Sequence, residues 1–259
     1  MELHKNIEVL VATMHQEQGD YSLLEKMNIK SDAIICNQCE RYSAEKINWY
    51  GHNIQWFSFA ERGVGLNRNN ALMRATNEII VFADDDMVYE DNYVEIISRA
   101  YCELPDADVI VFNLIEDKPT RYIIPKVQKV GRLNYLRYGA ARITAKNSVI
   151  KLNGIHFNRS FGGGTEHSAG EDNLFLTSCL QRRLKVYAYP AYIARLTEER
   201  PSTWNTGDFS KQLQDKGILY KLISRKWWKL LCLQDAMRHS RTYGMSRYKA
   251  YKLMVKYSK

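Results

Sequence analysis

Three consecutive carboxylates, Asp84, Asp85 and Asp86, directly follow an apolar run in the stretch EIIVFADDDMVYEDNY. Adjacent carboxylates raise one another's pKa, and a bound divalent cation commonly relieves that repulsion. Carboxylate oxygens suit Mg²⁺ or Mn²⁺. The alternative is a solvated acidic turn before a helix that begins near Asp91, because Asp is favoured at helix N-termini. The triplet alone leaves both interpretations open.

Cationic side chains occur just upstream of this acidic triplet. A metal held by one or two carboxylates usually takes its other ligands from substrate phosphates, so a diphosphate-bearing substrate is the natural partner. The segment ERGVGLNRNNALMRA supplies Arg62, Arg68 and Arg74, and Gly63 and Gly65 permit close approach of the backbone. The same segment also has the pattern of a loop that leads into an amphipathic helix, which would need no site.

The elements that must position these residues alternate along the first 115 residues. Short β-branched and aromatic runs predict strands at residues 7–13, 32–37, 54–59, 79–83 and 108–114. Helix-like stretches lie between them, including SAEKINWY at residues 43–50. This alternation predicts an α/β fold with a mostly parallel, Rossmann-like sheet flanked by helices. The triplet then stands at the carboxyl end of a strand, where such sheets bind ligands.

The pattern weakens over residues 116–141, which we interpret as a connecting region with short strands. The glycine-rich loop FGGGTEHSAG follows at residues 161–170, and then the helix pattern EDNLFLTSCLQRRL and the strand KVYAYP. From Lys211 onward the chain is predicted to be helical.

The positive charge is confined to the end of the chain. The net charge is +8, residues 225–259 alone carry +9, and the rest carries −1. Within this tail, apolar residues recur at helical spacing at Trp227, Leu230, Leu233 and Met237. One interpretation is an interfacial helix pair within residues 223–259 that lies on an anionic membrane surface. The other is packing against the chain's own domain or a second subunit, so an oligomer stays open.

Two further features of the sequence indicate the cellular compartment of the protein. The chain contains no apolar run of 18 or more residues, and its first residues lead straight into a strand pattern. Its five cysteines are scattered, unlike a disulfide framework. We expect a cytoplasmic protein, peripheral on the inner face of the membrane if the tail binds lipid.

Five segments, taken in order, resemble the motifs of glycosyltransferase family 2: VLVATMH, IICNQCE, RGVGLNRNNAL, VFADDDM and GEDNLFLTSCLQRRLKVYAYP. With STW at residues 202–204, the chain is similar to bacterial transferases of capsule and surface polysaccharide assembly. The resemblance implies the GT-A fold over residues 1–215, followed by the basic helical tail over 216–259. It also implies metal-dependent transfer of a hexosyl group from a nucleotide-diphosphate sugar, expected to be a UDP-sugar. The implied acceptor is the hydroxyl of a saccharide or a lipid-linked oligosaccharide.

The same resemblance implies roles for individual residues. The triplet matches the family's D-x-D motif, so Asp86 and Asp84 are the expected ligands of Mn²⁺ or Mg²⁺, and Asp84 and Asp85 the expected donor contacts. If the strand's period of two continues, Asp85 points away from the other two. Further donor contacts are expected at Ala12, Thr13, Asn37, Gln38, Arg62, Asn67 and Arg68. The chain departs from the family where an Asp-Gly-Ser-like turn reads NQCER and an SRN element reads LNRNN.

The acceptor side is expected at the ED pair, with Asp172 as the base and Glu171 as its close rival; helix capping is the alternative for both. A carboxylate at a helix N-terminus is stabilised in its charged form, so its pKa is expected to stay near the usual range. One base and one direct displacement predict inversion at the anomeric carbon. Acceptor contacts are expected at Glu166, His167 and Trp204, although a loop histidine can simply pack or face water.

Two other functions compete with this one. A Mg²⁺-dependent nucleotidyltransferase would also use an acidic triplet. A nucleic-acid-binding module would use the basic, tyrosine-rich tail, but it leaves the acidic triplet unexplained, because acidic side chains repel a polyanion. We therefore expect no nucleic-acid partner.

Overall fold

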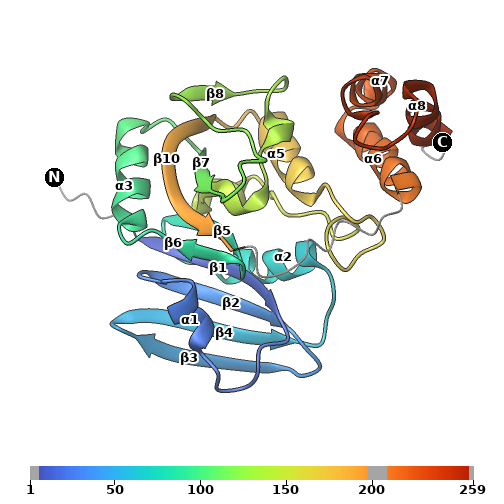
Figure 1. Cartoon of the computed structure of the whole chain (residues 1–259). Helices are drawn as coiled ribbons and strands as arrows, with labels where there is room; N and C mark the ends of the chain where they lie inside the picture. The colour runs from blue at the N-terminus through green and yellow to red at the C-terminus, as the bar shows by residue number, and fades with distance from the viewer. Residues whose placement is uncertain (1–5, 198–208, 257–259) are drawn as a thin grey trace.

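The computed structural model describes residues 6–197 and 209–256. Within these ranges ten strands form one sheet in the order β3-β4-β2-β1-β5-β9-β7-β10-β6, and β8 pairs with β10. Helices α6, α7 and α8 gather at one end of the molecule, beside the C-terminus (Figure 1). The strands are β1 (Ile7–Met14), β2 (Asp32–Gln38), β3 (Ser43–Trp49), β4 (His52–Phe59), β5 (Ile79–Asp84), β6 (Met87–Tyr89), β7 (Val109–Ile115), β8 (Gln128–Val130), β9 (Ile143–Lys146) and β10 (Val186–Leu196).

Helices cover both faces of this sheet. They are α1 (Ser22–Lys26), α2 (Val64–Arg74), α3 (Tyr93–Glu103), α4 (Asn147–Leu152), α5 (Glu171–Gln181), α6 (Phe209–Ile223), α7 (Trp228–His239) and α8 (Arg247–Lys256), with short 3₁₀ turns at Tyr135–Arg137 and Ala140–Arg142. Strands β4, β2, β1 and β5 are parallel, as are β7 and β10, whereas β9 joins β5 to β7 by antiparallel pairing. The predicted α/β fold with a central sheet between helices is confirmed.

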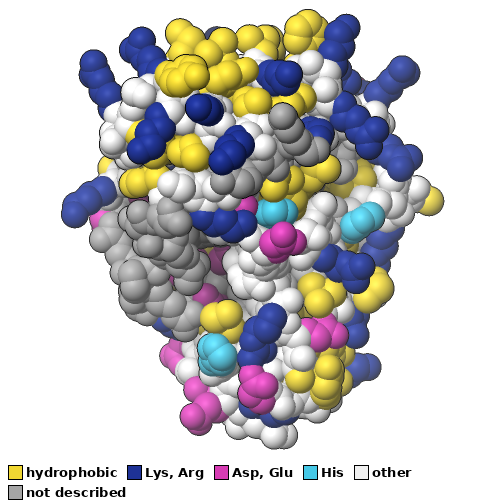
Figure 2. Space-filling model, turned by 90° about the vertical axis from the view of Figure 1, so that its right-hand side faces the viewer, with side chains coloured by type: hydrophobic (Ala, Val, Ile, Leu, Met, Phe, Trp, Pro, Cys, Tyr) yellow, Lys and Arg dark blue, Asp and Glu magenta, His cyan; other side chains and the backbone are white. Residues whose placement is uncertain are grey.

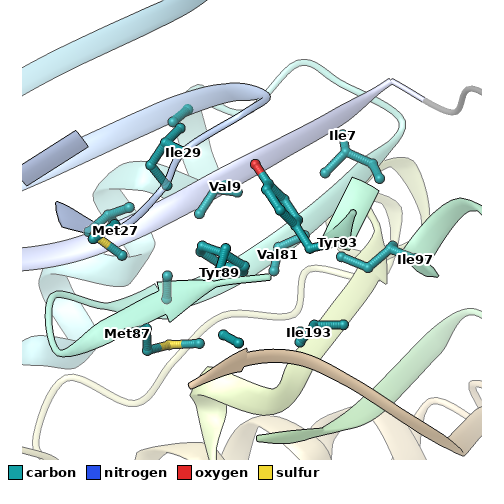
Figure 3. Packing of buried hydrophobic residues seen from close by; sticks show 14 of the residues in the cluster. Ile7, Val9, Met27, Ile29, Val81, Met87, Tyr89, Tyr93, Ile97 and Ile193 are labelled. Carbon is teal, nitrogen blue, oxygen red and sulfur yellow. The ribbon is translucent and has the colours of Figure 1, made fainter. Parts of the chain in front are cut away.

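Alternation along the buried strands builds two hydrophobic cores. In β1, Val9 and Val11 face the core that also holds residues of α1 and α3. Leu10, between them, faces the opposite core, with residues of α2 and α5. Figure 3 shows the first core, where Tyr93 of α3 lies over Val9 and Val81. A strand with helices on both faces is apolar at nearly every position, and this explains the near-continuous apolar runs in the sequence.

The predicted helix at residues 43–50 is wrong, because Ser43–Trp49 forms strand β3. Its side chains alternate between half-buried and exposed positions, and it pairs antiparallel with β4 at the edge of the sheet. The reversal at Tyr50 and Gly51 has positive φ at both residues, +48° and +90°. Two such residues form the tight turn that matches the twist of a hairpin.

The C-terminal helices form a unit with a small core of its own, made by Leu213, Cys232, Ala236, Tyr243, Ala250 and Met254. The boundary predicted between residues 215 and 216 falls inside α6, which runs from Phe209 to Ile223. The division of the chain into these two domains remains a prediction. In the described ranges, none of the helices combines the length and apolar character needed to cross a membrane.

Candidate active site

Arg68 of α2 lies at the centre of the candidate site. Only 4% of its surface is exposed, and its guanidinium bonds two carboxylates from distant parts of the chain. Its Nη2 donates to Oδ1 of Asp84 at 2.6 Å, and its Nη1 donates to Oε1 of Glu171 at 2.8 Å. Burial alone would lower the pKa of Arg68, but the two carboxylates outweigh burial and raise it. One buried cation thus joins the end of β5 to the start of α5.

The three aspartates of the triplet have different surroundings. Asp84 faces Arg68, and 36% of its side chain is exposed. Asp85 accepts a hydrogen bond from the Thr13 hydroxyl at 2.7 Å, across the sheet at the end of β1. Asp86 is half-buried, and its pKa is raised to about 6 by burial and then by repulsion from Asp84 and Asp85. The three aspartates therefore differ in their contacts: Asp84 bonds Arg68, and Asp85 is hydrogen-bonded to Thr13 of the sheet.

The oxygen atoms of the acidic triplet determine whether it can bind a metal ion. Among the described residues, no group of three or more His, Cys, Asp and Glu side chains is arranged to hold a metal ion. Asp84 and Asp86 nevertheless offer hard oxygen atoms, and the raised pKa of Asp86 comes partly from carboxylate repulsion. Such a pair fits a Mg²⁺ or Mn²⁺ ion that takes most of its ligands from substrate phosphates.

Asp172 is the second residue of α5 and lies half-buried in the first helical turn. Its Oδ1 accepts the backbone N–H of Asn173 at 2.7 Å. Burial, followed by repulsion from Glu171, raises the pKa of Asp172 to about 7. The expectation of a pKa near the usual range is therefore wrong, since burial outweighs the favourable helix N-terminus.

Stability should report this raised pKa. Because the folded protein keeps the Asp172 proton at pH values where the unfolded chain has lost it, the carboxyl's contribution stabilises the fold at low pH and is lost as pH rises from about 4 to 7. We expect Asp172→Asn to flatten the decline of the unfolding free energy over this interval, measured by urea titration at several pH values. Identical pH dependence in the variant and the parent would contradict the assignment.

Glycines in the loop before α5 allow its backbone to approach Glu171 closely. Gly162 has a φ of +103°, and a Cβ there would lie 2.4 Å from Cγ1 of Val64 and 2.9 Å from Cδ of Glu171. Gly170, just before α5, has a φ of +115°, and a Cβ there would lie 2.7 Å from Leu219 of α6. These glycines bring α2, α5 and α6 together around the site.

A cleft of about 740 Å³ opens beside these residues. Arg68, Asp84, Glu171 and Asp172 are among the residues that line it. Further lining residues come from Leu114 of β7, Arg121, the segment 132–142, the loop before α5, Asn173, and helices α6 and α7. Sequence reasoning missed these wall residues, since residues 116–141 carried no clear pattern and the tail's basic residues were assigned to a surface. The cleft therefore joins the acidic triplet, the ED pair and the helical unit.

The predicted donor contacts on the first two strands lie outside this cleft. Asn37 is fully buried, and its amide exchanges hydrogen bonds with the backbone of Gln16, at 3.0 Å in both directions. Asn67 donates from Nδ2 to the Cys36 carbonyl at 2.8 Å. These side chains hold the strand ends in place, and donor contacts from them remain a prediction.

Other predicted donor residues also line the ends of β1 and β2. Ala12, Thr13 and Gln38 are buried there. Arg62 is partly exposed, forms an ion pair with Glu40 and donates to the Cys39 carbonyl at 3.2 Å. These positions stay candidates for nucleotide contacts at the carboxyl edge of the sheet.

The predicted acceptor contacts are His167, Glu166 and Trp204. His167 is buried, its Nδ1 lies 2.9 Å from Oδ1 of Asp215 in α6, and its ring lies 4.5 Å from that of Phe161. These contacts join the glycine-rich loop to α6, and acceptor binding by His167 remains a prediction. Glu166 is exposed and does not line the cleft. Trp204 lies outside the described residues.

Comparison with solved structures identifies proteins that share this fold. The solved structure of S. aureus TarS 1–349 in complex with UDP-GlcNAc shares the fold, with a TM-score of 0.65 and 12% identity over 97% of this chain and 90% of that one. The complex of TarS 1–349 with UDP gives 0.61 and 13% over the same shares. A longer TarS structure gives 0.62 and 14%, and 55% of it is covered.

These low identities establish the fold alone, and no curated protein matches the chain. The model of the family described as "Glycosyl transferase family 2" matches residues 21–161, more than half of the sequence. That segment includes the acidic triplet and Arg68. The chain therefore belongs to glycosyltransferase family 2.

Proposed function

We propose that the protein transfers a sugar from a nucleotide-diphosphate sugar to an acceptor hydroxyl with inversion at the anomeric carbon. The observation that carries this proposal is the Arg68 bridge, which holds Asp84 of the donor motif and Glu171, the neighbour of Asp172, in the lining of one cleft. The TarS complex with UDP-GlcNAc supports a UDP-sugar as the donor. A direct displacement needs donor and base side by side, and the lining of one cleft by both Asp84 and Asp172 supports the proposal.

Asp172 is the better candidate for the base. Glu171 is 3% exposed and is held by Arg68, whereas Asp172 is half-buried, lines the cleft and has no ion pair among the described residues. A pKa of about 7 leaves a substantial ionised fraction at neutral pH and makes the carboxylate a stronger base than usual. Asp172 takes the proton of the acceptor hydroxyl as its oxygen attacks the anomeric carbon. The bond from that carbon to the diphosphate breaks, and the nucleotide diphosphate leaves.

Asp86 and Asp84 would hold the Mg²⁺ or Mn²⁺ ion. When bound, the ion neutralises charge on the departing diphosphate. Arg68 fixes the orientation of Asp84 through the 2.6 Å hydrogen bond. The Thr13 hydroxyl keeps Asp85 directed toward β1.

A thermal-shift screen of UDP, GDP, CMP and TDP sugars, with and without Mn²⁺, tests the donor side. We expect one nucleotide class to raise Tm only when Mn²⁺ is present, because Asp84 and Asp86 would hold the ion and the ion would supply positive charge for the diphosphate. Asp86→Asn should abolish the Mn²⁺-dependent part of the shift. Asp91→Asn, which removes an exposed carboxylate paired with Lys30, is the control and should keep it. The absence of any shift with all four classes would contradict the proposed donor.

We also propose that the helical unit rests on an anionic membrane surface and that the acceptor is lipid-linked. Trp227, Leu230 and Met237 are 57%, 56% and 56% exposed, whereas Cys232 and Ala236 face the unit's core. The predicted apolar stripe therefore points away from the chain's own domain. Figure 2 shows hydrophobic side chains gathered at this end of the molecule, with Lys and Arg around them. Apolar side chains ringed by cations suit anionic lipid, the occupant that we propose.

Vesicle flotation with the full chain tests this surface. The double variant Trp227→Ser/Leu230→Ser is expected to lose most binding to vesicles of phosphatidylglycerol and phosphatidylcholine, because it removes exposed apolar area at the interface. Met73→Ser, which changes an apolar side chain that is 68% exposed on α2, is the control and should float like the parent. Unchanged flotation of the double variant would exclude the lipid role. A change confined to its sedimentation would assign the stripe to a second subunit instead.

A further inference from the structure

Three arginines that line the cleft have no carboxylate partner among the described residues: Arg132, Arg137 and Arg238. All three are exposed. The remaining cations of the wall are already engaged. Arg68 bonds Asp84 and Glu171, and Lys216 bonds Asp235 at 3.0 Å.

The other two cleft arginines are engaged as well. Arg121 pairs with Glu116, outside the cleft lining. Arg142 is buried and donates from Nε to the Phe112 carbonyl at 2.6 Å and from Nη2 to Oδ1 of Asn113 at 3.0 Å. These three arginines thus bring positive charge without a carboxylate partner to the cleft, and Asp172 lines the same cleft without an ion pair among the described residues.

The arginines come from two different elements. Arg132 and Arg137 belong to the segment around the 3₁₀ turn Tyr135–Arg137, and Arg238 lies in the last turn of α7. The guanidinium of Arg137 stacks on the ring of Tyr122, 4.4 Å from its centroid, which orients it and leaves its N–H groups available. Two elements that line one cleft therefore present guanidinium groups, the side chains best suited to bind phosphate oxygens.

We infer that this wall is a subsite for a phosphate group carried by the acceptor; the inference rests on the proposed transferase function. A neutral saccharide would not require unpaired arginines beside the base. The donor's diphosphate belongs with Asp84 and Asp86, and the predicted nucleotide contacts on β1 and β2 lie outside the cleft. The phosphate on this wall is therefore that of the second substrate.

Helix α7 connects this subsite to the membrane-facing stripe. Leu231, Gln234 and Arg238 line the cleft, whereas Leu230 and Met237, about a quarter of a turn away on the same helix, are exposed. A lipid-linked phosphate would place its charged group on the cleft side and its chain on the outer side. A soluble phosphate would use the cleft side alone, so the two sources predict different affinities.

Isothermal titration calorimetry tests the subsite with farnesyl monophosphate and glycerol 3-phosphate as probes. The full chain is used, with UDP and Mn²⁺ present so that the donor side is filled. We expect the triple variant Arg132→Gln/Arg137→Gln/Arg238→Gln to bind both probes about tenfold or more weakly, since charge-assisted hydrogen bonds are lost. The matched control, Arg99→Gln/Arg159→Gln/Arg182→Gln, removes three exposed arginines outside the cleft and should bind like the parent.

The outcomes distinguish a lipid-linked phosphate from a soluble one. They also distinguish failure of the subsite from failure of the proposed function. Tighter binding of farnesyl monophosphate than of glycerol 3-phosphate would identify a lipid-linked acceptor, and equal binding a soluble one. Failure of both probes to bind the parent, or equal binding by the triple variant, would overturn the subsite. Titrations repeated without UDP report on the subsite even if UDP does not bind. A parent that binds the probes but none of the UDP, GDP, CMP and TDP sugars would refute the proposed function and leave the subsite standing.

Discussion

Replacing Asp172 with asparagine is expected to lower kcat by about 10²–10⁴-fold, the range attributed to a general base. The amide has the shape of the carboxyl group and can still accept the N–H of Asn173, but it cannot take a proton from the acceptor. Donor affinity should change little, because the ion pairs between Arg68, Asp84 and Glu171 do not include Asp172. The account therefore predicts a variant that binds donor and does not turn it over.

Two measurements separate these effects. Release of nucleotide diphosphate from the donor gives the rate, and the Mn²⁺-dependent thermal shift gives donor binding. Asp91→Asn is the control, because it removes an exposed carboxylate that pairs with Lys30 and does not line the cleft. A nearly unchanged rate in Asp172→Asn would transfer the role of base to Glu171 or to another residue.

Replacing Arg68 with methionine is expected to reduce the unfolding free energy by about 3–5 kcal/mol, the cost of breaking a buried ion pair on one side. Methionine fills part of the volume but leaves Glu171 charged, buried and without its cation. Oε2 of Glu171 already has no hydrogen-bond partner, so the carboxylate has little left to compensate it. Arg68→Lys should also destabilise the protein, since one ammonium group does not reproduce the planar fork that bonds two carboxylates.

The double variant Arg68→Met/Glu171→Gln distinguishes lost charge pairing from lost packing. It should recover part of the stability, because the stranded charge has been removed. Arg62→Met is the control, since it breaks an ion pair with Glu40 on the exposed surface and should cost about 1 kcal/mol or less. Urea denaturation measures the unfolding free energy of the parent and of each of these four variants. A loss below 1 kcal/mol for Arg68→Met would show that the bridge does not organise the site.

Much of the fold could be predicted because its strands are buried on both faces. Residues 79–83 form an apolar run that only a strand between two helical layers requires, and the structure places β5 there. Strand β3 was missed because it lies at the edge, where Glu45 and Lys46 are tolerated and the apolar signal is weak. The hairpin turn at Tyr50 and Gly51 was the available clue, since glycine readily adopts positive φ.

The candidate site could be predicted in its residue types but not in its connections. Asp86 and Asp172 were selected by carboxylate chemistry and family resemblance. The bond between Arg68 and Glu171 joins residues 103 positions apart, and no local pattern specifies such a contact. The pKa of Asp172 was misjudged for the same reason, because burial is a tertiary property. The two interpretations of His167, acceptor contact or packing, could not be separated from the sequence, because its partner Asp215 lies 48 residues further along the chain.

The most direct test of sugar transfer with inversion is time-resolved proton NMR of the products formed from an α-linked UDP-sugar in the presence of Mn²⁺. Water serves as the acceptor where no other is supplied, so the first free sugar released reports the stereochemistry. The account predicts that the β anomer appears first, together with UDP, and that Asp172→Asn forms neither product at a comparable rate. Initial release of the α anomer would contradict the single displacement by which we assign Asp172, Asp84 and Asp86 their roles.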